Sequence, residues 1–285
     1  MMQSVVITGV STGIGRSAAE HLLKLGYRVF GSVRQEATAV EMKAHLGESF
    51  IPLVFDVTDE PAVAKAKALV EAALAGQTLA ALVNNAGIAV AGPLETLSTA
   101  DLRRQLETNL MGPHIVTRAF LPLLGAVKGF SGLPGRIVNV SSIAGRISFP
   151  LMGPYAVSKH GLEAYSDSLR RELQVWGIDV IVLGPGAVKT PIWDKAEQND
   201  MSSLAGGPYE AAAKGMMGYA ASSAINGLDA NVIAKAVEKA LTTKRPKARY
   251  VLVKNFLIDW WLPAHLPKRL FDAALAKGLG LHRQK

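Results

Sequence analysis

The amino-terminal strand, turn and helix constrain the fold of this 285-residue chain more than any other feature. Residues 4–8 are a short, β-branched, apolar run, typical of a buried strand, and they lead directly into a glycine-rich turn. Beyond the turn, alanine and leucine recur at helical spacing up to Gly26, a residue type common just after a helix. A dinucleotide pyrophosphate requires this order, because glycines let the backbone approach it and a helix N-terminus offers free N–H groups.

Tyr155 and Lys159 form a second informative pair, because residues four apart share one face of a helix. A free tyrosine has a pKa of about 10 and is a weak acid at neutral pH. A nearby ammonium favours the phenolate, so we expect Lys159 to lower the pKa of Tyr155 and to promote proton exchange with a substrate oxygen. Ser142, upstream of the pair, can hold the same oxygen by a hydrogen bond. A tyrosine and a lysine at this spacing can also be an ordinary surface pair, so a catalytic role for Tyr155 and Lys159 depends on the other motifs.

Apolar runs alternate with helical patterns along the chain, which predicts an α/β fold with one doubly wound, mostly parallel sheet and helices on both faces. The expected strands are residues 4–8, 28–33, 50–55, 79–83, 136–140 and 179–183. The expected helices include residues 61–74, 101–124 and 155–176, with a kink at Gly112 and Pro113, because proline removes a helix hydrogen bond. Ligands of such sheets lie beyond the carboxyl ends of the strands, where Asp56, Asn84, Ser142 and residues 184–186 fall.

With these motifs in place, about the first 190 residues resemble the classical group of the short-chain dehydrogenase/reductase family. The resemblance is carried by the T-G-x-x-x-G-x-G turn at 8–15, Asp56-Val57, the N-N-A-G run at 84–87, Asn109, Ser142, Tyr155 with Lys159, and Pro185-Gly186 followed by Thr190. It implies a Rossmann-type fold and hydride transfer, with Tyr155 as general acid/base and Ser142 orienting the substrate oxygen. It further implies that Lys159 binds the nicotinamide ribose and that Asn109 completes a proton relay through water. The alternative for Asn109 is a helix-interior residue bonded to neighbouring backbone.

The resemblance also implies which residues bind the nucleotide. They are Gly9, Ser11, Thr12, Gly13, Ile14, Gly15, Arg34, Asp56, Val57, Asn85, Ala86, Gly87, Tyr155, Lys159, Pro185, Gly186, Val188 and Thr190. In this fold an acidic residue after the second strand binds a free ribose 2′-hydroxyl, whereas an arginine accommodates a 2′-phosphate. Val33 stands at the acidic position and Arg34 follows it, which predicts NADP(H) rather than NAD(H). Thr12 stands where many NADP-using relatives place a second basic residue.

Length and composition predict a single domain over residues 1–285, since 49% of the residues are hydrophobic and no linker-like stretch divides the chain. Within it, we expect residues 190–228 to form the substrate-binding loop and helices. The chain has no cysteine, and its six histidines show no metal-ligand spacing, so we expect neither disulfides nor a metal site. We expect no signal peptide, because the first strand begins at about residue 4, and no apolar run reaches the roughly 18 residues of a membrane span. We therefore expect a cytoplasmic protein.

Residues 255–285 are predicted to form a basic, amphipathic, helical tail. Residues 244–285 contain 10 Lys and Arg against 2 Asp and Glu, whereas the two kinds balance at 21 each before them. Such a segment is typical of a lid over a lipophilic pocket, of a subunit contact and of a peripheral membrane helix. We favour a lid or packing role over membrane contact. Nucleic-acid binding is not expected, because the basic run at 244–247 is short.

Apolar residues near the catalytic pair predict a lipophilic ketone, aldehyde or alcohol as substrate. The candidate wall residues, each of which packs equally well in a core, are Ile143, Ile147, Phe149, Leu151, Met152, Ile192, Trp193, Met216 and Met217. The tail is loosely similar to that of family members acting on steroids or retinoids. Two other functions stay open: a nucleotide-sugar epimerase or dehydratase, and a non-catalytic NADP(H)-sensing protein. The resemblance also implies a homodimer or homotetramer, paired through the long helices that hold Asn109 and Tyr155.

Overall fold

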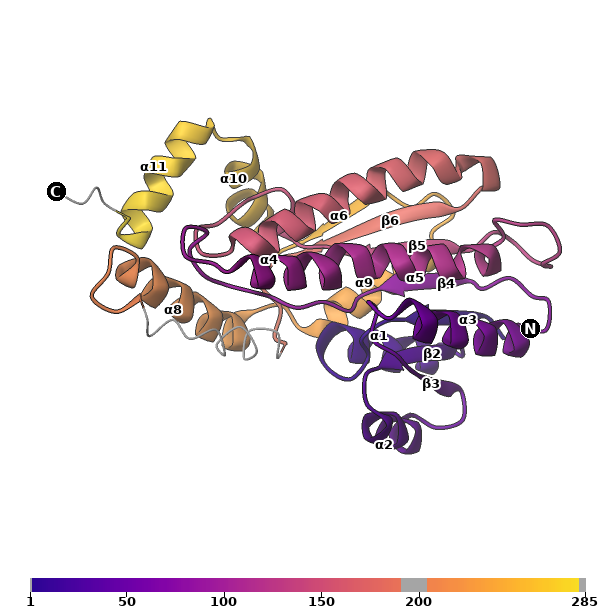
Figure 1. The fold of residues 1–285 in the computed structure, drawn as a ribbon. Helices are drawn as coiled ribbons and strands as arrows, with labels where there is room; N and C mark the ends of the chain where they lie inside the picture. The colour runs from indigo at the N-terminus through magenta and orange to yellow at the C-terminus, as the bar shows by residue number, and fades with distance from the viewer. Residues whose placement is uncertain (1, 191–203, 282–285) are drawn as a thin grey trace.

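Seven parallel strands form one sheet at the centre of the molecule (Figure 1). The computed structural model describes residues 2–190 and 204–281. The strands are β1 (Ser4–Ile7), β2 (Arg28–Val33), β3 (Phe50–Val54), β4 (Ala81–Asn84), β5 (Arg136–Val140), β6 (Asp179–Pro185) and β7 (Arg249–Leu252). Their order is β3-β2-β1-β4-β5-β6-β7, and every pairing is parallel. Because the order reverses between β1 and β4, the loops that follow these strands diverge and leave a crevice, which is where such sheets bind ligands.

Helices cover both faces of the sheet. The longer ones are α1 (Gly13–Lys24), α2 (Glu36–Leu46), α3 (Glu60–Leu74), α4 (Thr99–Leu106), α5 (Gly112–Phe120), α6 (Gly153–Glu172), α8 (Glu210–Asn226), α9 (Ala230–Thr242) and α11 (Lys268–Leu279). One core packs α1, α2 and α9 against the sheet, and a second packs α3 and α5 against the opposite face. Along β1, Val5 and Ile7 belong to the first core and Val6 to the second. The doubly wound fold expected from the sequence is confirmed.

The edge strand β7 was not expected. All four of its residues are only partly buried, and it pairs with β6 from Val182↔Arg249 to Pro185↔Leu252. The run R-Y-V-L is only four residues long and lies between a basic segment and the tail, so no sequence signal marks it as a separate strand. The other six strands match their predicted positions to within a few residues, although β4 begins at Ala81 instead of residue 79.

The long helix predicted at 101–124 is interrupted, as its Gly-Pro pair suggests. A π-helical turn, η1 (Glu107–Met111), joins α4 to α5, and the Gly112 N–H bonds to the carbonyl of Glu107. A 3-10 turn, η2 (Leu121–Leu124), closes the helix before Gly125. Because Pro113 has no N–H, the backbone widens at this point, and Asn109 lies inside the widened turn.

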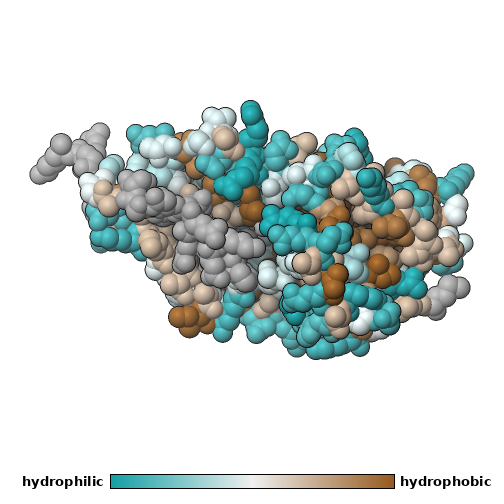
Figure 2. Space-filling view, turned by 60° about the horizontal axis from the view of Figure 1, so that its bottom comes forward, coloured by the Kyte–Doolittle hydropathy of each residue, from teal (hydrophilic) through white to brown (hydrophobic). Residues whose placement is uncertain are grey.

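The C-terminal segment lies at one end of the sheet, beside α8 (Figure 1). It comprises η6 (Leu257–Trp261), α10 (Leu262–His265) and α11. The end of α11 packs with α8 through Leu279, which shares a small apolar cluster with Leu151 and Ala212. Figure 2 shows that hydrophobic residues also reach the surface among hydrophilic ones. Among the described residues, no helix is long and apolar enough to span a membrane.

Candidate active site

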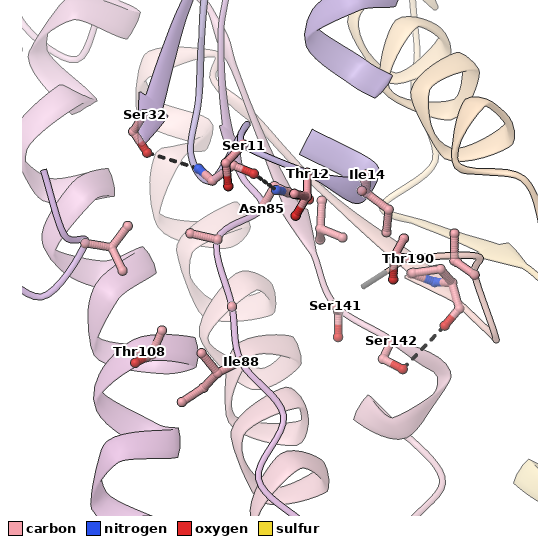
Figure 3. A pocket seen from close by; sticks show the side chains of 18 of the residues that line it. Ser11, Thr12, Ile14, Ser32, Asn85, Ile88, Thr108, Ser141, Ser142 and Thr190 are labelled. Carbon is pink, nitrogen blue, oxygen red and sulfur yellow. Dashed lines mark hydrogen bonds between the residues drawn. The ribbon is translucent and has the colours of Figure 1, made fainter. Parts of the chain in front are cut away.

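One cleft lies at the carboxyl ends of the central strands, and it holds nearly all the residues expected to bind a nucleotide (Figure 3). Ser142, Tyr155 and Lys159 line the same cleft. Of the expected set, only Gly15 and Asn109 do not line it. The lining also includes residues that the sequence did not assign to the site: Ser32, Phe55, Ile88, Thr108, Val140 and Ser141. Ser32, Phe55, Val140 and Ser141 lie at the ends of strands, and Ile88 and Thr108 adjoin matched motifs, and these two signals could have found them.

The glycine turn allows a very close approach of backbone segments. Gly9 has a φ of +70°, and a Cβ atom there would lie 2.9 Å from the Cα of Ala86. A Cβ atom on Gly15 would lie 2.3 Å from the carbonyl oxygen of Gly9, so Gly15 shapes the turn from behind. The turn ends at Thr12, and α1 begins without a side-chain cap and without an acidic residue in its first turn. Its N–H groups and positive dipole end therefore suit a pyrophosphate.

Side chains from neighbouring strands fix this turn. Asn85 donates from Nδ2 to the carbonyl oxygens of Thr8 and Gly9, at 2.9 and 3.0 Å. The Thr8 hydroxyl accepts the N–H groups of Asn85 and Ala86. The Ser32 hydroxyl at the end of β2 accepts the Gly9 N–H at 3.0 Å, and Figure 3 shows Ser32 and Asn85 on opposite sides of the turn. The turn is thus held in shape by its own protein contacts.

The end of β2 lacks an acidic side chain. Val33 is buried at the last strand position, and Arg34 is exposed on the rim of the cleft. The guanidinium of Arg34 is therefore available to an anionic group at this rim. A ribose 2′-phosphate is such a group, and a bare 2′-hydroxyl has no carboxylate to bind here.

The catalytic candidates come from two elements. Tyr155 and Lys159 lie in the first turns of α6, and Ser142 follows β5 as the N-cap of the short turn η3 (Ile143–Gly145). The Ser142 hydroxyl accepts the Ala144 N–H at 3.1 Å. The Lys159 Nζ lies 5.6 Å from the centre of the Tyr155 ring and donates to the carbonyl oxygen of Val140 at 2.9 Å. The structure therefore brings the predicted triad together at one edge of the cleft.

The expected lowering of the Tyr155 pKa is wrong for this geometry. Desolvation of the buried hydroxyl raises the pKa of Tyr155 to about 12, although a hydrogen bond with Ser142 opposes the rise. Burial also lowers the pKa of Lys159 to about 8, against the opposing charge of Glu163. Desolvation favours the neutral form of each group, and it is the largest cause of both shifts. Tyr155 is thus a neutral phenol, ready to donate a proton.

Asn109 lies one layer behind the cleft. Its amide accepts the Ile88 N–H and donates to the Ile88 carbonyl, both at 2.9 Å, and donates to the Ser158 hydroxyl at 3.2 Å. Gln105, which the sequence analysis missed, contacts the same segment through Ile88 and Val90. Ile88 itself lines the cleft. In the structure Asn109 fixes the floor of the cleft, and its part in a proton relay stays a prediction.

An apolar wall adjoins Tyr155 on the side away from the glycine turn. Met152, Phe149 and Met216 pack with Tyr155, together with Ala89 and Ala91. The Phe271 ring of α11 packs edge-on against Phe149, with 6.5 Å between ring centres. Of the other expected wall residues, Ile143, Ile147 and Leu151 are buried, whereas Met217 is mostly exposed. Ile192 and Trp193 lie outside the described residues.

Comparisons with known proteins agree with this geometry. The model of the short chain dehydrogenase family matches residues 3–201. An NADPH-dependent 3-dehydrocapnine reductase from Ornithobacterium rhinotracheale is 37% identical, over 98% of this chain and 98% of its own. Human retinol dehydrogenase 5 is 33% identical, over 95% of this chain and 87% of its own. A short-chain dehydrogenase/reductase from Burkholderia phymatum, solved in complex with NAD, has a TM-score of 0.75 at 27% identity, over 96% of this chain and 95% of its own.

Proposed function

Because this chain belongs to the short-chain dehydrogenase/reductase family and is an oxidoreductase, we propose that it uses NADP(H) to interconvert a lipophilic ketone or aldehyde with its alcohol. One observation carries the proposal: Ser142, Tyr155 and Lys159 converge where the cleft meets an apolar wall. In this position a carbonyl group can face the cleft while the rest of the substrate contacts apolar side chains.

The side chains have complementary tasks in the reduction. The nucleotide, when bound, supplies the hydride. Ser142 holds the carbonyl oxygen by a hydrogen bond, and Tyr155 gives that oxygen a proton, which a phenol with a pKa of about 12 still carries at neutral pH. Lys159 lies beside the Tyr155 ring as a cation that stabilises the resulting phenolate. Oxidation of the alcohol reverses each transfer.

The choice of NADP(H) rests on Arg34 and on the missing acid at Val33. The relative from Ornithobacterium rhinotracheale is named as NADPH-dependent, which supports the same choice. The relative from Burkholderia phymatum was solved with NAD, so the fold alone does not decide between the two nucleotides. The residues at the end of β2 favour NADP(H).

Three features support a lipophilic substrate. The wall around Tyr155 is built from Phe149, Met152 and Met216. The described part of the 190–228 segment contributes α8, which carries Met216. Helix α11 of the 255–285 tail packs on Phe149 through Phe271 and on α8 through Leu279. We assign the 190–228 segment to substrate binding and α11 to a lid over this wall. The names of two relatives, a 3-dehydrocapnine reductase and a retinol dehydrogenase, support a lipophilic substrate as well.

The proposal is tested by following the absorbance of the reduced nicotinamide. The substrates are 3-dehydrocapnine, retinol and 2-decanone, with acetone as the small polar comparison. We expect turnover of at least one lipophilic compound and little of acetone. The control is Tyr155→Phe, which keeps the ring and removes the proton, and should lower kcat on the order of 10²- to 10⁴-fold. NADPH binding without Tyr155-dependent turnover of any compound would instead favour a nucleotide-sensing protein.

We also propose that the exposed part of the tail makes a further contact. Phe256, Leu257 and Ile258 each expose more than half of their surface, and Lys254 lies just before them in a segment rich in Lys and Arg. This combination suits the peripheral surface of a membrane. By resemblance to the family, we further propose pairing of two chains through the interrupted helix that holds Asn109 (α4, η1 and α5) and through α6, which holds Tyr155. The two contacts involve different surfaces, so they can be tested separately.

A further inference from the structure

A buried carboxylate lies directly behind the catalytic groups. Glu163 lies on α6 four residues after Lys159, and its side chain is only 5% exposed. A buried carboxylate is costly to the fold unless a cation and hydrogen bonds satisfy it. Arg249 of β7 supplies both, with its Nε at 3.1 and 3.0 Å from the two carboxylate oxygens. The edge strand that the sequence analysis missed therefore reaches under the active site.

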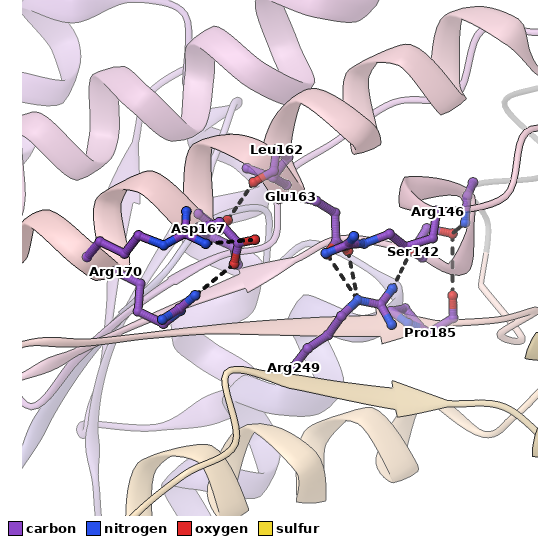
Figure 4. A network of polar contacts seen from close by, with 12 residues as sticks. Ser142, Arg146, Leu162, Glu163, Asp167, Arg170, Pro185 and Arg249 are labelled. Atoms are coloured by element: carbon purple, nitrogen blue, oxygen red, sulfur yellow. Dashed lines mark hydrogen bonds and ion pairs between the residues drawn. The ribbon is translucent and has the colours of Figure 1, made fainter. Parts of the chain in front are cut away.

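The same arginine contacts the backbone of the catalytic serine. The Arg249 Nη2 donates to the carbonyl oxygen of Ser142 at 3.1 Å, and Figure 4 shows the guanidinium between Glu163 and Ser142. The Gly145 N–H also donates to this carbonyl oxygen at 3.1 Å. A guanidinium can bind two acceptors at once because its N–H groups form a rigid planar fork. The ion pair with Glu163 thereby sets where the Ser142 backbone lies.

A ring from the C-terminal segment covers the arginine. The guanidinium carbon of Arg249 lies 4.4 Å from the ring centre of Trp260, in η6. The backbone leaves room for the arrangement, since a Cβ atom on Gly184 would lie 2.4 Å from the Arg249 Nη2. Likewise, a Cβ atom on Gly145 would lie 2.8 Å from the Glu163 Cγ. A side chain at either position would clash with the Arg249–Glu163 ion pair, so both positions require glycine.

We propose that Arg249, held between Glu163 and Trp260, is a positioning residue that fixes Ser142 for catalysis and makes the active site depend on the C-terminal segment. The inference rests on the proposed reductase function. Arg249 and Trp260 touch neither the nucleotide cleft nor Tyr155 in the described structure, so they act through the Ser142 backbone. They should affect kcat rather than nucleotide binding.

The first test compares variants of Arg249 in the reduction of 2-decanone, or of the best substrate from the screen above. Arg249→Lys keeps a cation beside Glu163 but loses the fork to Ser142. We expect kcat to fall about 10- to 100-fold, because a misplacement of about 1 Å at a reacting group costs on the order of 10²-fold. The KM for NADPH should stay unchanged. Full activity in Arg249→Lys would overturn the proposal, since neutralising Glu163 would then be the whole role of Arg249.

Arg146 offers a matched control. Its Nε lies 3.5 Å from the same Glu163 carboxylate, but its side chain is half exposed, and among the described residues no hydrogen bond joins that side chain to Ser142. Arg146→Lys removes the same fork and should leave kcat within about twofold of the wild type, as expected for an exposed ion pair. A loss in Arg146→Lys equal to that in Arg249→Lys would show that only the charge around Glu163 matters.

A second test uses Trp260, which is partly exposed and can be changed without emptying a core. Trp260→Ala should lower kcat about threefold to tenfold, the equivalent of one cation–π contact, and Trp260→Phe should recover most of it. In a Ser142→Ala background, Trp260→Ala should cause no further loss, because its effect passes through Ser142. The same fold-loss in both backgrounds would refute the coupling.

A third measurement does not depend on turnover. Hydrogen–deuterium exchange at the Gly145 amide reports the hydrogen bond that it makes to the Ser142 carbonyl. Exchange there should accelerate in Arg249→Lys and not in Arg146→Lys. Unchanged exchange in Arg249→Lys would contradict the positioning role of Arg249, even if no substrate were turned over. A wild type that reduces none of the compounds would contradict only the proposed reductase function.

Discussion

At the scale of single residues, burial controls the chemistry of the site more than the spacing of its charges does. Helical spacing correctly placed Tyr155 and Lys159 together, but it predicted a lowered tyrosine pKa where desolvation raises it. Sequence shows which groups can meet and does not show how much water they lose on meeting. The direction of a pKa shift depends on that loss, and so it required the structure.

The lowered pKa of Lys159 predicts a pH dependence for the reduction. A lysine carries its charge below its pKa, so Lys159 is a cation below about pH 8 and loses its charge above it. The phenolate formed on Tyr155 then has no cation beside it. We expect kcat/KM to fall as the pH rises through about 8. In Lys159→Arg, whose guanidinium keeps its charge, the fall should move to much higher pH. An identical alkaline limb in both enzymes would rule out Lys159 as its source.

Arg34 gives a prediction for nucleotide choice. Removing one charge-assisted hydrogen bond, worth about 1.5–3 kcal/mol, should weaken NADPH binding roughly 10- to 100-fold in Arg34→Ala. NADH, which has no 2′-phosphate, should bind almost as before. Fluorescence titration with both nucleotides measures the two changes separately. Equal weakening of NADPH and NADH would mean that Arg34 does not recognise the phosphate.

At the scale of elements, sequence pattern located most helices and strands because their signals are local. The strand from Ser4 to Ile7 has apolar residues on both faces, and α3 begins at a recognisable Asp59 cap. The edge strand β7 was missed because its four partly exposed residues carry no periodic signal, and its pairing with β6 is a long-range event. The π-helical turn at Asn109 was only indicated by the neighbouring proline. What the sequence could not provide was the contact between Arg249 and Ser142, which are far apart in the chain.

The cap of α3 gives a prediction for stability. The Asp59 carboxylate accepts the Ala62 N–H at 3.0 Å, at an exposed helix end. Asp59→Ala should lower the free energy of unfolding by about 1 kcal/mol, and Asp59→Asn should largely preserve it. Urea unfolding followed by circular dichroism measures both variants. If Asp59→Ala were as stable as the wild type, the first turn of α3 would be satisfied by water alone.

At the scale of the whole molecule, the functional parts gather at one end of the sheet. The nucleotide cleft lies at the carboxyl ends of the strands, and the apolar wall adjoins it at Tyr155. Helix α11 lies beside α8 (Figure 1), where Leu279 packs with Ala212. The amino-terminal part of the chain matches the family model up to residue 201. Of the apolar wall, Phe149 and Met152 lie within this matched part, whereas Met216 of α8 and the C-terminal helices follow it.

The exposed residues of the tail give a prediction for membrane contact. Phe256, Leu257 and Ile258 expose 56%, 54% and 61% of their surfaces, so changing all three to serine should leave the fold intact. In flotation with vesicles containing anionic lipid, the wild type should float and the triple serine variant should stay in solution. Flotation of both proteins would show that these residues are not the anchor. Light scattering of the same samples reports whether the chains pair, and pairing should not differ between them.

Strand β7 has a consequence for how the chain is made. On a ribosome, every residue of the nucleotide cleft is synthesised before residue 191, whereas β7 emerges some sixty residues later. Until then β6, whose Val180 to Pro185 stretch is buried in the finished protein, has one unpaired edge. An open apolar edge invites pairing with other chains. A nascent protein at this stage would therefore be vulnerable to aggregation. The nucleotide cleft would be synthesised before β7, and so before Arg249 could position Ser142.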